Sequence, residues 1–236
     1  MSTWYSSYEE NNYGDLFYSL IRIYQPEKVV ELGTKTGYSA YHMARGLEDN
    51  DKGTLDCYDL WENYLENEGI DFMHKSVAKH NLEEFKHIVS LTKRDAVGVD
   101  KLYDMVDILH IDLDNGEPGI LDMVIPAWID KTRQIIIIEG GSAERDKIDL
   151  DLSYKKMPVG QWINKFGAKE ADYLKKLVPK QDSKTGRERK YVIVNGDKRF
   201  KKIPIQEWLK EFSKKRPDIE YFTFEPFPSL TIIRKR

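Results

Sequence analysis

Short apolar runs alternate along the chain with segments in which apolar residues recur at helical spacing. The runs lie near residues 29, 55, 88, 108 and 136. Between the first two of them, Ala40, Met43, Ala44 and Leu47 stand at i, i+3, i+4 and i+7, which is the stripe of an amphipathic helix. Strands that alternate with helices predict an α/β protein with a mostly parallel sheet and helices on both faces.

The two ends of the chain have patterns of their own. Residues 1–14 concentrate aromatic side chains among polar ones, which predicts a segment that folds over the protein at the mouth of its site. These aromatic residues are Trp4, Tyr5, Tyr8 and Tyr13. Near the C-terminus, the apolar runs 221–224 and 230–233 flank a short turn that contains two prolines. This spacing predicts an antiparallel hairpin.

Residues 28–44 join a strand, a glycine turn and a helix. Glu31 follows the apolar pair Val29 and Val30, and Gly33 and Gly37 frame the turn. Glycine permits tight turns and close backbone approaches that a Cβ would prevent. The helix after the turn begins with unpaired N–H groups, which suit a polar ligand. The spacing G-x-x-x-G matches neither the dinucleotide fingerprint nor a P-loop.

The second and third apolar runs are also followed by acids. Residues 54–59 read as a strand that ends at Asp59, where an acid can accept two hydrogen bonds from a ribose diol. The alternative is that Asp59 caps the next helix. Residues 87–91 read as the third strand, and Asp95 and Ala96 follow it.

Polar side chains crowd the end of the fourth apolar run. His110, Asp112, Asp114 and Asn115 stand there, at the edge where open α/β sheets bind their ligands. Because burying such groups without partners is costly, their clustering favours a functional site over helix capping. Glu139 ends the next run, residues 134–139, and we expect it to lie on a strand adjacent to that of Asp112.

Two of these stretches resemble a known family. Residues 30–37, Val-Glu-Leu-Gly-Thr-Lys-Thr-Gly, resemble the first motif of class I S-adenosylmethionine (SAM) methyltransferases. Residues 110–115 resemble the His-Ile-Asp-Gly-Asp-His block of a branch that methylates hydroxyls of sugars and natural products, with Leu113 and Asn115 in place of Gly and His. The resemblance covers about residues 27–141 and 219–234, roughly 60% of the chain.

The resemblance implies a fold and a domain organisation. The expected fold is a Rossmann-like sheet of seven mostly parallel strands, with helices on both faces and a C-terminal antiparallel hairpin. Residues 1–236 would form a single class I methyltransferase-like domain. The aromatic segment 1–14 and a substrate-side insertion at about 142–202 would be its additions.

The resemblance also implies an activity, SAM-dependent methyl transfer to a hydroxyl of a sugar or a natural-product-like small molecule. Asp95 would hydrogen-bond the adenine amino group. The implied cofactor-binding residues are Glu31, Gly33, Thr34, Gly37, Tyr38, Ser39, Asp59, Leu60, Asp95, Ala96 and Asp112. The implied catalytic residues are Asp112, His110 and Glu139.

Two other functions stay open. The departures at Leu113, Asn115 and Gly140 allow a non-catalytic SAM- or nucleotide-binding protein of the same fold. A nicotinamide-dependent oxidoreductase is the other alternative, and the absence of a third glycine in the first turn argues against it.

Two mechanisms are open for the carboxylates. Asp112 and Glu139 could together bind Mg²⁺, which relieves their repulsion and needs few protein ligands. Resembling enzymes use a further ligand where this chain has Gly140. The alternative is metal-free catalysis, with Asp112 or His110 as the base and one carboxylate sharing a proton.

Composition narrows the choice of partners. The net charge of the 236 residues is −3, so no strong field attracts nucleic acid or a membrane surface. The single cysteine, Cys57, excludes an internal disulfide. No apolar run approaches the ~18 residues of a membrane span, and the N-terminus does not read as a signal peptide. The sequence therefore predicts a cytoplasmic protein with a small hydroxylated acceptor, and leaves the oligomeric state open, a homo-oligomer included.

Overall fold

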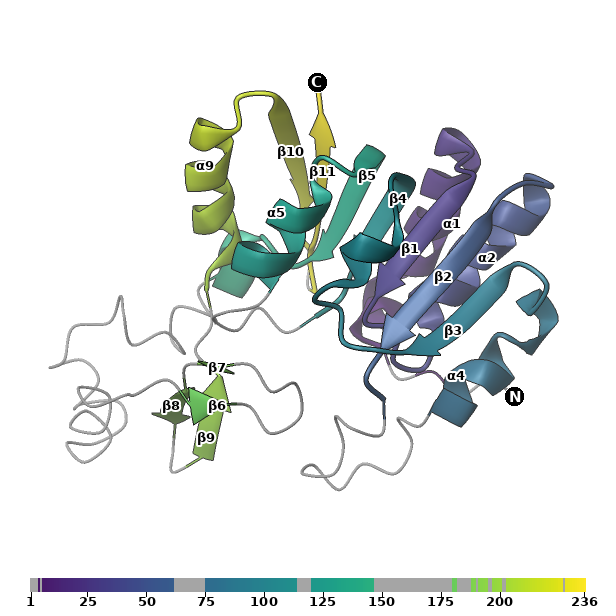
Figure 1. Ribbon diagram of the computed structural model, residues 1–236, viewed down its shortest axis with the longest axis horizontal. Helices are drawn as coiled ribbons and strands as arrows, with labels where there is room; N and C mark the ends of the chain where they lie inside the picture. Colours follow the sequence, from purple (N-terminus) through teal and green to yellow (C-terminus); the bar gives the residue numbers. More distant parts are fainter. Residues whose placement is uncertain are drawn as a thin grey trace, which may run out of the picture.

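A seven-stranded sheet forms the centre of the protein in the computed structural model (Figure 1). The structure describes residues 4, 6–61, 75–113, 120–146, 180–181, 188–189, 191–194, 197–200, 203–226 and 228–236. The strand order is β10-β11-β5-β4-β1-β2-β3. The strands are β1 (Lys28–Leu32), β2 (Thr54–Asp59), β3 (Val89–Lys93), β4 (Val106–Ile111), β5 (Thr132–Glu139), β10 (Ile219–Phe224) and β11 (Leu230–Lys235).

The sheet is parallel except at β11. Strand β1 pairs in parallel with β2 and β4, and β3 and β5 extend the parallel ladder on either side. Strand β11 is antiparallel to both β5 and β10. The carboxyl ends of the parallel strands therefore meet along the lower edge in Figure 1. The predicted sheet, with its closing antiparallel hairpin, is confirmed.

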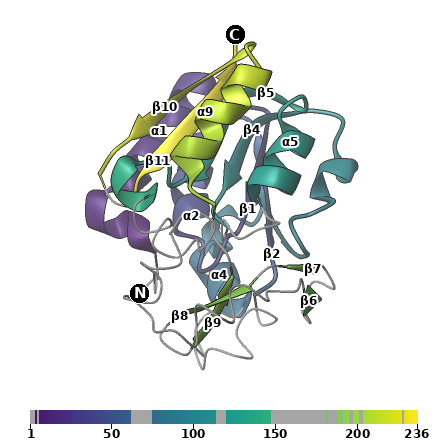
Figure 2. The same cartoon turned by 90° about the vertical axis from the view of Figure 1, so that its left-hand side faces the viewer.

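Helices cover both faces of the sheet, as predicted (Figure 2). Helices α1 (Tyr13–Tyr24), α2 (Tyr38–Asp49) and α4 (Lys75–Asn81) lie on one side, together with the 3₁₀ turns η1 (Ser7–Asn11) and η2 (Glu83–Phe85). Helices α5 (Ile125–Trp128) and α9 (Ile205–Lys215), the 3₁₀ turn η3 (Val99–Leu102) and the π-turn η4 (Ile120–Val124) lie on the other.

Each face has its own apolar core. Successive residues of a strand point to opposite faces, so Val29 joins the core under α1 and α2, whereas Val30 joins the core under α5 and α9. By the same alternation, Glu31 points toward α1 and α2. The strand register thereby decides on which face each polar group is buried.

The predicted third strand is displaced by two residues. The apolar pattern indicated residues 87–91, but β3 spans Val89–Lys93. The N–H of Ile88 donates to the carbonyl of Phe85 at 2.9 Å, which keeps Ile88 in the turn after η2. Between β2 and β3, α4 and η2 are the described helical segments, and residues 62–74 lie outside the described residues.

The aromatic N-terminal segment lies against α2. The Trp4 ring contacts Tyr38 and Tyr41 with centroid distances of 5.8 and 5.2 Å. Tyr8 is only 1% exposed. The segment therefore packs on the domain, close to the carboxyl ends of the central strands.

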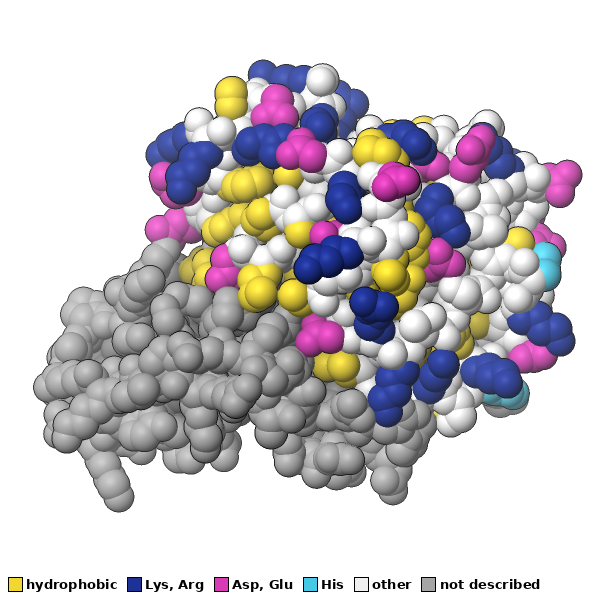
Figure 3. Space-filling model, in the orientation of Figure 1, with side chains coloured by type: hydrophobic (Ala, Val, Ile, Leu, Met, Phe, Trp, Pro, Cys, Tyr) yellow, Lys and Arg dark blue, Asp and Glu magenta, His cyan; other side chains and the backbone are white. Residues whose placement is uncertain are grey.

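Part of the insertion at about 142–202 is described. Strand β6 (Lys180–Gln181) pairs with β7 (Glu188–Arg189), and β8 (Tyr191–Val194) pairs with β9 (Asp197–Phe200), each as a two-stranded antiparallel sheet. On the face seen in Figure 3, acidic and basic side chains are interspersed with apolar ones. Among the described residues, no helix has both the length and the apolar character of a membrane span.

Candidate functional site

The glycine turn between β1 and α2 packs directly on the residue that follows β4. Gly33 and Gly37 have φ of +94° and +90°. A Cβ on Gly33 would lie 1.9 Å from the carbonyl oxygen of Asp112. The N–H of Asp112 in turn donates to the carbonyl of Leu32 at 2.9 Å. Glycine is therefore required at position 33 both by its φ and by the approach of Asp112.

The end of β2 fixes the middle of this turn. Lys35 has φ +52°, its N–H donates to Asp59 Oδ2 at 2.7 Å, and its carbonyl accepts from Trp61 Nε1 at 2.8 Å. Asp59 Oδ1 also accepts from the Trp61 N–H at 2.8 Å. Burial raises the pKa of Asp59, and the backbone donors of Lys35 and Trp61 partly offset it. Asp59 thus reaches the glycine turn, as a site residue should, and also caps its own loop.

Glu31 is a fully buried acid with one unpaired oxygen. Its Oε1 accepts from Ser39 Oγ at 2.5 Å and from His110 Nδ1 at 3.0 Å. Among the described residues, neither Glu31 Oε2 nor Thr34 Oγ1 has a hydrogen-bond partner, although both atoms are buried. The thiol of the buried Cys57 lies next to both residues and interacts with each of them. Thr34 also lines the adjoining pocket, where a ligand could supply a further partner.

His110 lies behind the wall of the site. It is 0% exposed, its Nδ1 bonds Glu31, and its Nε2 lies 3.4 Å from the Tyr8 hydroxyl. A carboxylate can only accept, so Nδ1 carries the proton and Nε2 accepts from Tyr8. Burial, followed by the charges of nearby acids, raises the pKa of Tyr8 well above its usual value and keeps the phenol protonated. A direct catalytic role of His110 stays a prediction.

Asp112 and Glu139 form a hydrogen-bonded carboxyl pair. They stand at the ends of the adjacent strands β4 and β5, as predicted. Burial raises the pKa of Asp112 well above its usual value, and the charge and hydrogen bond of Glu139 raise it further, whereas Lys35 lowers it. The Ser7 hydroxyl donates to Glu139 Oε1 at 3.3 Å. The folded protein therefore favours the protonated form of Asp112 more than water does.

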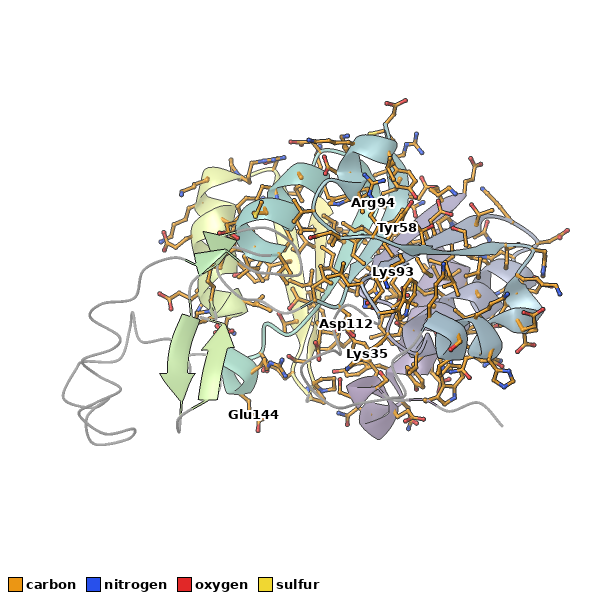
Figure 4. All side chains as sticks on the ribbon, turned by 60° about the horizontal axis from the view of Figure 1, so that its bottom comes forward. Lys35, Tyr58, Lys93, Arg94, Asp112 and Glu144 are labelled. Carbon is orange, nitrogen blue, oxygen red and sulfur yellow. The ribbon has the colours of Figure 1, made fainter. Side chains whose placement is uncertain are left out.

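A polar pocket opens between the glycine turn and the N-terminal segment. It is lined by Ser6, Thr34, Lys35, Thr36, Tyr38, Ser39 and Asp112. In Figure 4 the labelled Lys35 and Asp112 lie next to each other, and Tyr58, Lys93 and Arg94 follow along the same edge of the sheet. No side chain caps the first turn of α2, so its N–H groups face this region.

The remaining predicted residues lie at the same edge of the sheet. Leu60 follows Asp59, and Asp95 and Ala96 follow β3, the neighbour of β2. Asp95 Oδ1 accepts from the N–H of Val97 at 2.9 Å, so its carboxylate also orders its own loop. Their contact with a cofactor stays a prediction. Asp114 and Asn115 lie outside the described residues.

The sequence did not single out Ser6, Ser7, Tyr8 or Trp61 as site residues. Their only signal was the aromatic cluster at the N-terminus and the position of Trp61 two residues after Asp59. Trp61 is 2% exposed and secures the glycine turn. These contacts join segments far apart in the chain, which no local pattern reveals.

The Mg²⁺ site of Asp112 and Glu139 stays a prediction. In the part of the chain that the structure describes, no group of three or more His, Cys, Asp or Glu side chains could hold a metal, so no third side chain of these types joins the two carboxyls there. Gly140, with φ +96° and Ile205 against it, contributes no side chain.

Comparisons with known proteins agree with this geometry. Residues 30–163, more than half of the chain, match the family model described as a methyltransferase domain. None of the curated proteins compared with the chain matches it.

Solved structures share the fold at low sequence identity. An O-methyltransferase from Bacillus cereus in complex with SAH is 15% identical, with a TM-score of 0.59 over 95% of this chain and 81% of that one. A putative O-methyltransferase from Klebsiella pneumoniae is 17% identical, with a TM-score of 0.56 over 95% and 80%. The O-methyltransferase TomG from Streptomyces achromogenes, involved in tomaymycin synthesis and solved with SAM, is 16% identical, with a TM-score of 0.55 over 97% and 86%.

Proposed function

The chain belongs to the methyltransferase domain family, and we propose that it transfers the methyl group of SAM to a hydroxyl of a small molecule. The observation that carries this proposal is that Asp112, which lines the glycine-turn pocket, and Glu139 stand at the ends of the adjacent strands β4 and β5. Such a pair provides a proton acceptor next to the turn on which the cofactor would bind. The O-methyltransferases that share the fold support the same assignment.

The pocket suits the cofactor at several points. SAM supplies an activated methyl group on a positively charged sulfur. Glu31 Oε2 and Thr34 Oγ1, both buried and unpaired among the described residues, would bond the polar groups of its amino-acid end. The uncapped first turn of α2 would bind its carboxylate. Asp59, with lone pairs beyond those used by Lys35 and Trp61, would accept from the ribose diol.

The carboxyl pair would act as the base. Burial and the neighbouring Glu139 raise the pKa of Asp112, so Asp112 would hold a proton in a hydrogen bond to Glu139 and leave Glu139 as the acceptor. Glu139 would accept the proton of the acceptor hydroxyl as that oxygen takes the methyl group, and the proton would leave to solvent afterwards. The remaining contribution of the protein is to hold the oxygen in line with the methyl group.

For the acceptor, we propose a sugar or natural-product-like molecule with a free hydroxyl. The hydroxyls of Ser6, which lines the pocket beside Asp112, and Ser7, which donates to Glu139, suit a hydroxylated ligand next to the carboxyl pair. The involvement of the similar TomG in tomaymycin synthesis supports a natural product. The similarity of residues 110–115 to a sugar-directed branch supports the alternative of a sugar.

The test has a binding arm and a turnover arm. Calorimetry with SAM and with NAD measures which cofactor binds, and mass spectrometry then follows conversion of SAM to S-adenosylhomocysteine with 3,4-dihydroxybenzoate, simple phenols and methyl glycosides. We expect SAM to bind. At least one acceptor should gain about 14 mass units, because O-methylation replaces a hydrogen by a methyl group. SAM binding without turnover on any acceptor would favour the non-catalytic alternative, and NAD binding alone would refute the proposal.

Metal dependence is tested on the same reaction. We propose metal-free catalysis by the carboxyl pair, because no third His, Cys, Asp or Glu side chain joins Asp112 and Glu139 among the described residues. Methyl transfer should persist after exhaustive treatment with EDTA, and Asp112→Ala should abolish it. Loss of activity in EDTA that Mg²⁺ restores would show that a metal joins Asp112 and Glu139 after all.

A further inference from the structure

The turn of residues 6–8 is held in place from several directions. The Tyr8 ring packs at 5.1 Å from Phe17 and 5.8 Å from Tyr13 in edge-to-face geometry. The Ser6 hydroxyl accepts from the Tyr8 N–H at 3.2 Å and closes the turn. Since edge-to-face contacts and burial of an aromatic ring are stabilising, the position of the ring is set by packing.

The hydroxyl of Tyr8 forms a hydrogen bond that is separate from the packing of its ring. It donates to His110 Nε2 at 3.4 Å, His110 Nδ1 donates to Glu31 Oε1 at 3.0 Å, and Ser39 donates to the same oxygen at 2.5 Å. This row of side chains runs from η1 through β4 and β1 to α2. A phenylalanine would keep the ring packing but would leave His110 Nε2 without a donor, so the oxygen of Tyr8 ties the turn to the acids of the site.

The turn carries two hydroxyl groups to the reacting end of the site. Ser7 Oγ donates to Glu139 Oε1 at 3.3 Å, and Ser6 lines the pocket beside Asp112. Both bonds, Tyr8 to His110 and Ser7 to Glu139, are at the long end of the hydrogen-bond range. Each of them therefore depends on the turn being held in place.

We propose that Tyr8 is a positioning residue for methyl transfer, which fixes the turn of residues 6–8 so that Ser7 orients Glu139 toward the acceptor. This inference rests on the proposed function, because it assigns the N-terminal turn as one wall of the acceptor site. Tyr8 itself does not touch the acceptor. It acts through Ser7, and this indirect action is what an experiment can isolate.

The experiment is a double-mutant cycle on kcat, with the acceptor that the wild-type protein methylates fastest among 3,4-dihydroxybenzoate, simple phenols and methyl glycosides. Loss of one hydrogen bond of this kind should lower kcat by roughly 2- to 10-fold. We expect Ser7→Ala and Tyr8→Phe each to fall in this range. If Tyr8 acts through Ser7, Tyr8→Phe should have almost no further effect on kcat in the Ser7→Ala background.

Two further variants separate positioning from stability. Ser7→Thr keeps the hydroxyl and should retain kcat within about twofold of the wild type. Tyr18→Phe makes the same chemical change at a half-buried tyrosine that donates to Asp49 Oδ2 at 2.6 Å, and it should leave kcat unchanged. The affinity for SAM and the thermal midpoint are measured for every variant, so that a folding defect is recognised.

The outcomes are distinct. Multiplicative effects of Tyr8→Phe and Ser7→Ala on kcat, or an unchanged kcat in both single variants, would overturn this inference and leave the methyltransferase proposal standing. The absence of methyl transfer by the wild-type protein with every acceptor would overturn the proposed function and this inference with it. Non-additive losses of kcat in the double variant, with unchanged affinity for SAM, would support both the role of Tyr8 and the proposed methyltransferase function.

Discussion

Replacing Gly33 by alanine tests how the glycine turn is held against β4. A Cβ at this position would lie 1.9 Å from the carbonyl oxygen of Asp112, whereas real Cβ contacts are essentially never shorter than 3.0 Å. The backbone must therefore move by about 1 Å. Such a movement strains the buried bonds from Gly33 N to Tyr58 O at 2.8 Å and from Asp112 N to Leu32 O at 2.9 Å.

Gly98 provides a matched control for this substitution. Its φ of +87° is close to the +94° of Gly33, but nothing lies within 4 Å of the position of its Cβ. Gly98→Ala should therefore lose only the conformational term, about 1–2 kcal/mol. Gly33→Ala also strains two buried hydrogen bonds, each with a net contribution of about 0.5–1.5 kcal/mol, so we expect a total loss of about 2–5 kcal/mol.

Urea unfolding and thermal unfolding measure the difference. In a domain of this size, 1 kcal/mol shifts the midpoint by about 2–4 °C, so Gly33→Ala should unfold roughly 10 °C below the wild type and Gly98→Ala roughly 4 °C below. Calorimetry on folded Gly33→Ala should also show weakened SAM binding. Equal losses of stability in the two variants would refute the close approach of the turn to Asp112.

Three further substitutions test individual acids. Asp59→Ala should weaken SAM binding by roughly 1.5–3 kcal/mol, and calorimetry with unchanged affinity would contradict its cofactor role. Because the pKa of Asp112 is raised on folding, ionisation of this group destabilises the fold as pH rises above its unfolded value of about 3.9. The thermal midpoint of Asp112→Asn should therefore rise relative to that of the wild type as the pH increases from 5 to 8. A difference between the two midpoints that stays constant over this range would contradict the raised pKa. Burial alone would raise the pKa of Asp107, but the N–H groups of Lys28 and Glu27 outweigh it and lower the pKa. Asp107→Ala should cost about 2–4 kcal/mol at neutral pH, and the gap in urea unfolding should narrow as pH falls below about 4, where the wild-type carboxylate becomes protonated.

The buried arrangement of Glu31 and His110 changes how their chemistry is understood. The resemblance of residues 110–115 suggested His110 as a candidate base. In the structure, its two nitrogens bond Glu31 and Tyr8, and its ring lies 4.8 Å from Phe17. A ring enclosed in this way is suited to fixing the orientation of its neighbours, and the exposed part of the site is left to Asp112 and Glu139.

The sequence by itself determined the elements and the edge of the sheet at which the site lies. Apolar runs and stripes with a period of 3.6 are local properties, and they placed β2 at Thr54–Asp59 and the stripe of Ala40, Met43, Ala44 and Leu47 on α2. Glycine spacing and acids at strand ends are also local. They indicated the turn at Gly33 and the facing carboxyls of Asp112 and Glu139 because parallel strands bring their carboxyl ends together.

Only the tertiary structure decided what each polar group contacts. The bond from Tyr8 to His110 spans 102 residues and that from Ser7 to Glu139 spans 132, and nothing in the sequence near either residue specifies its partner. Proton sharing between Asp112 and Glu139 likewise depends on burial and on the distance between two strands. Local composition sets which segments become strands and helices, whereas the pairing of side chains across segments is fixed only when packing brings them together.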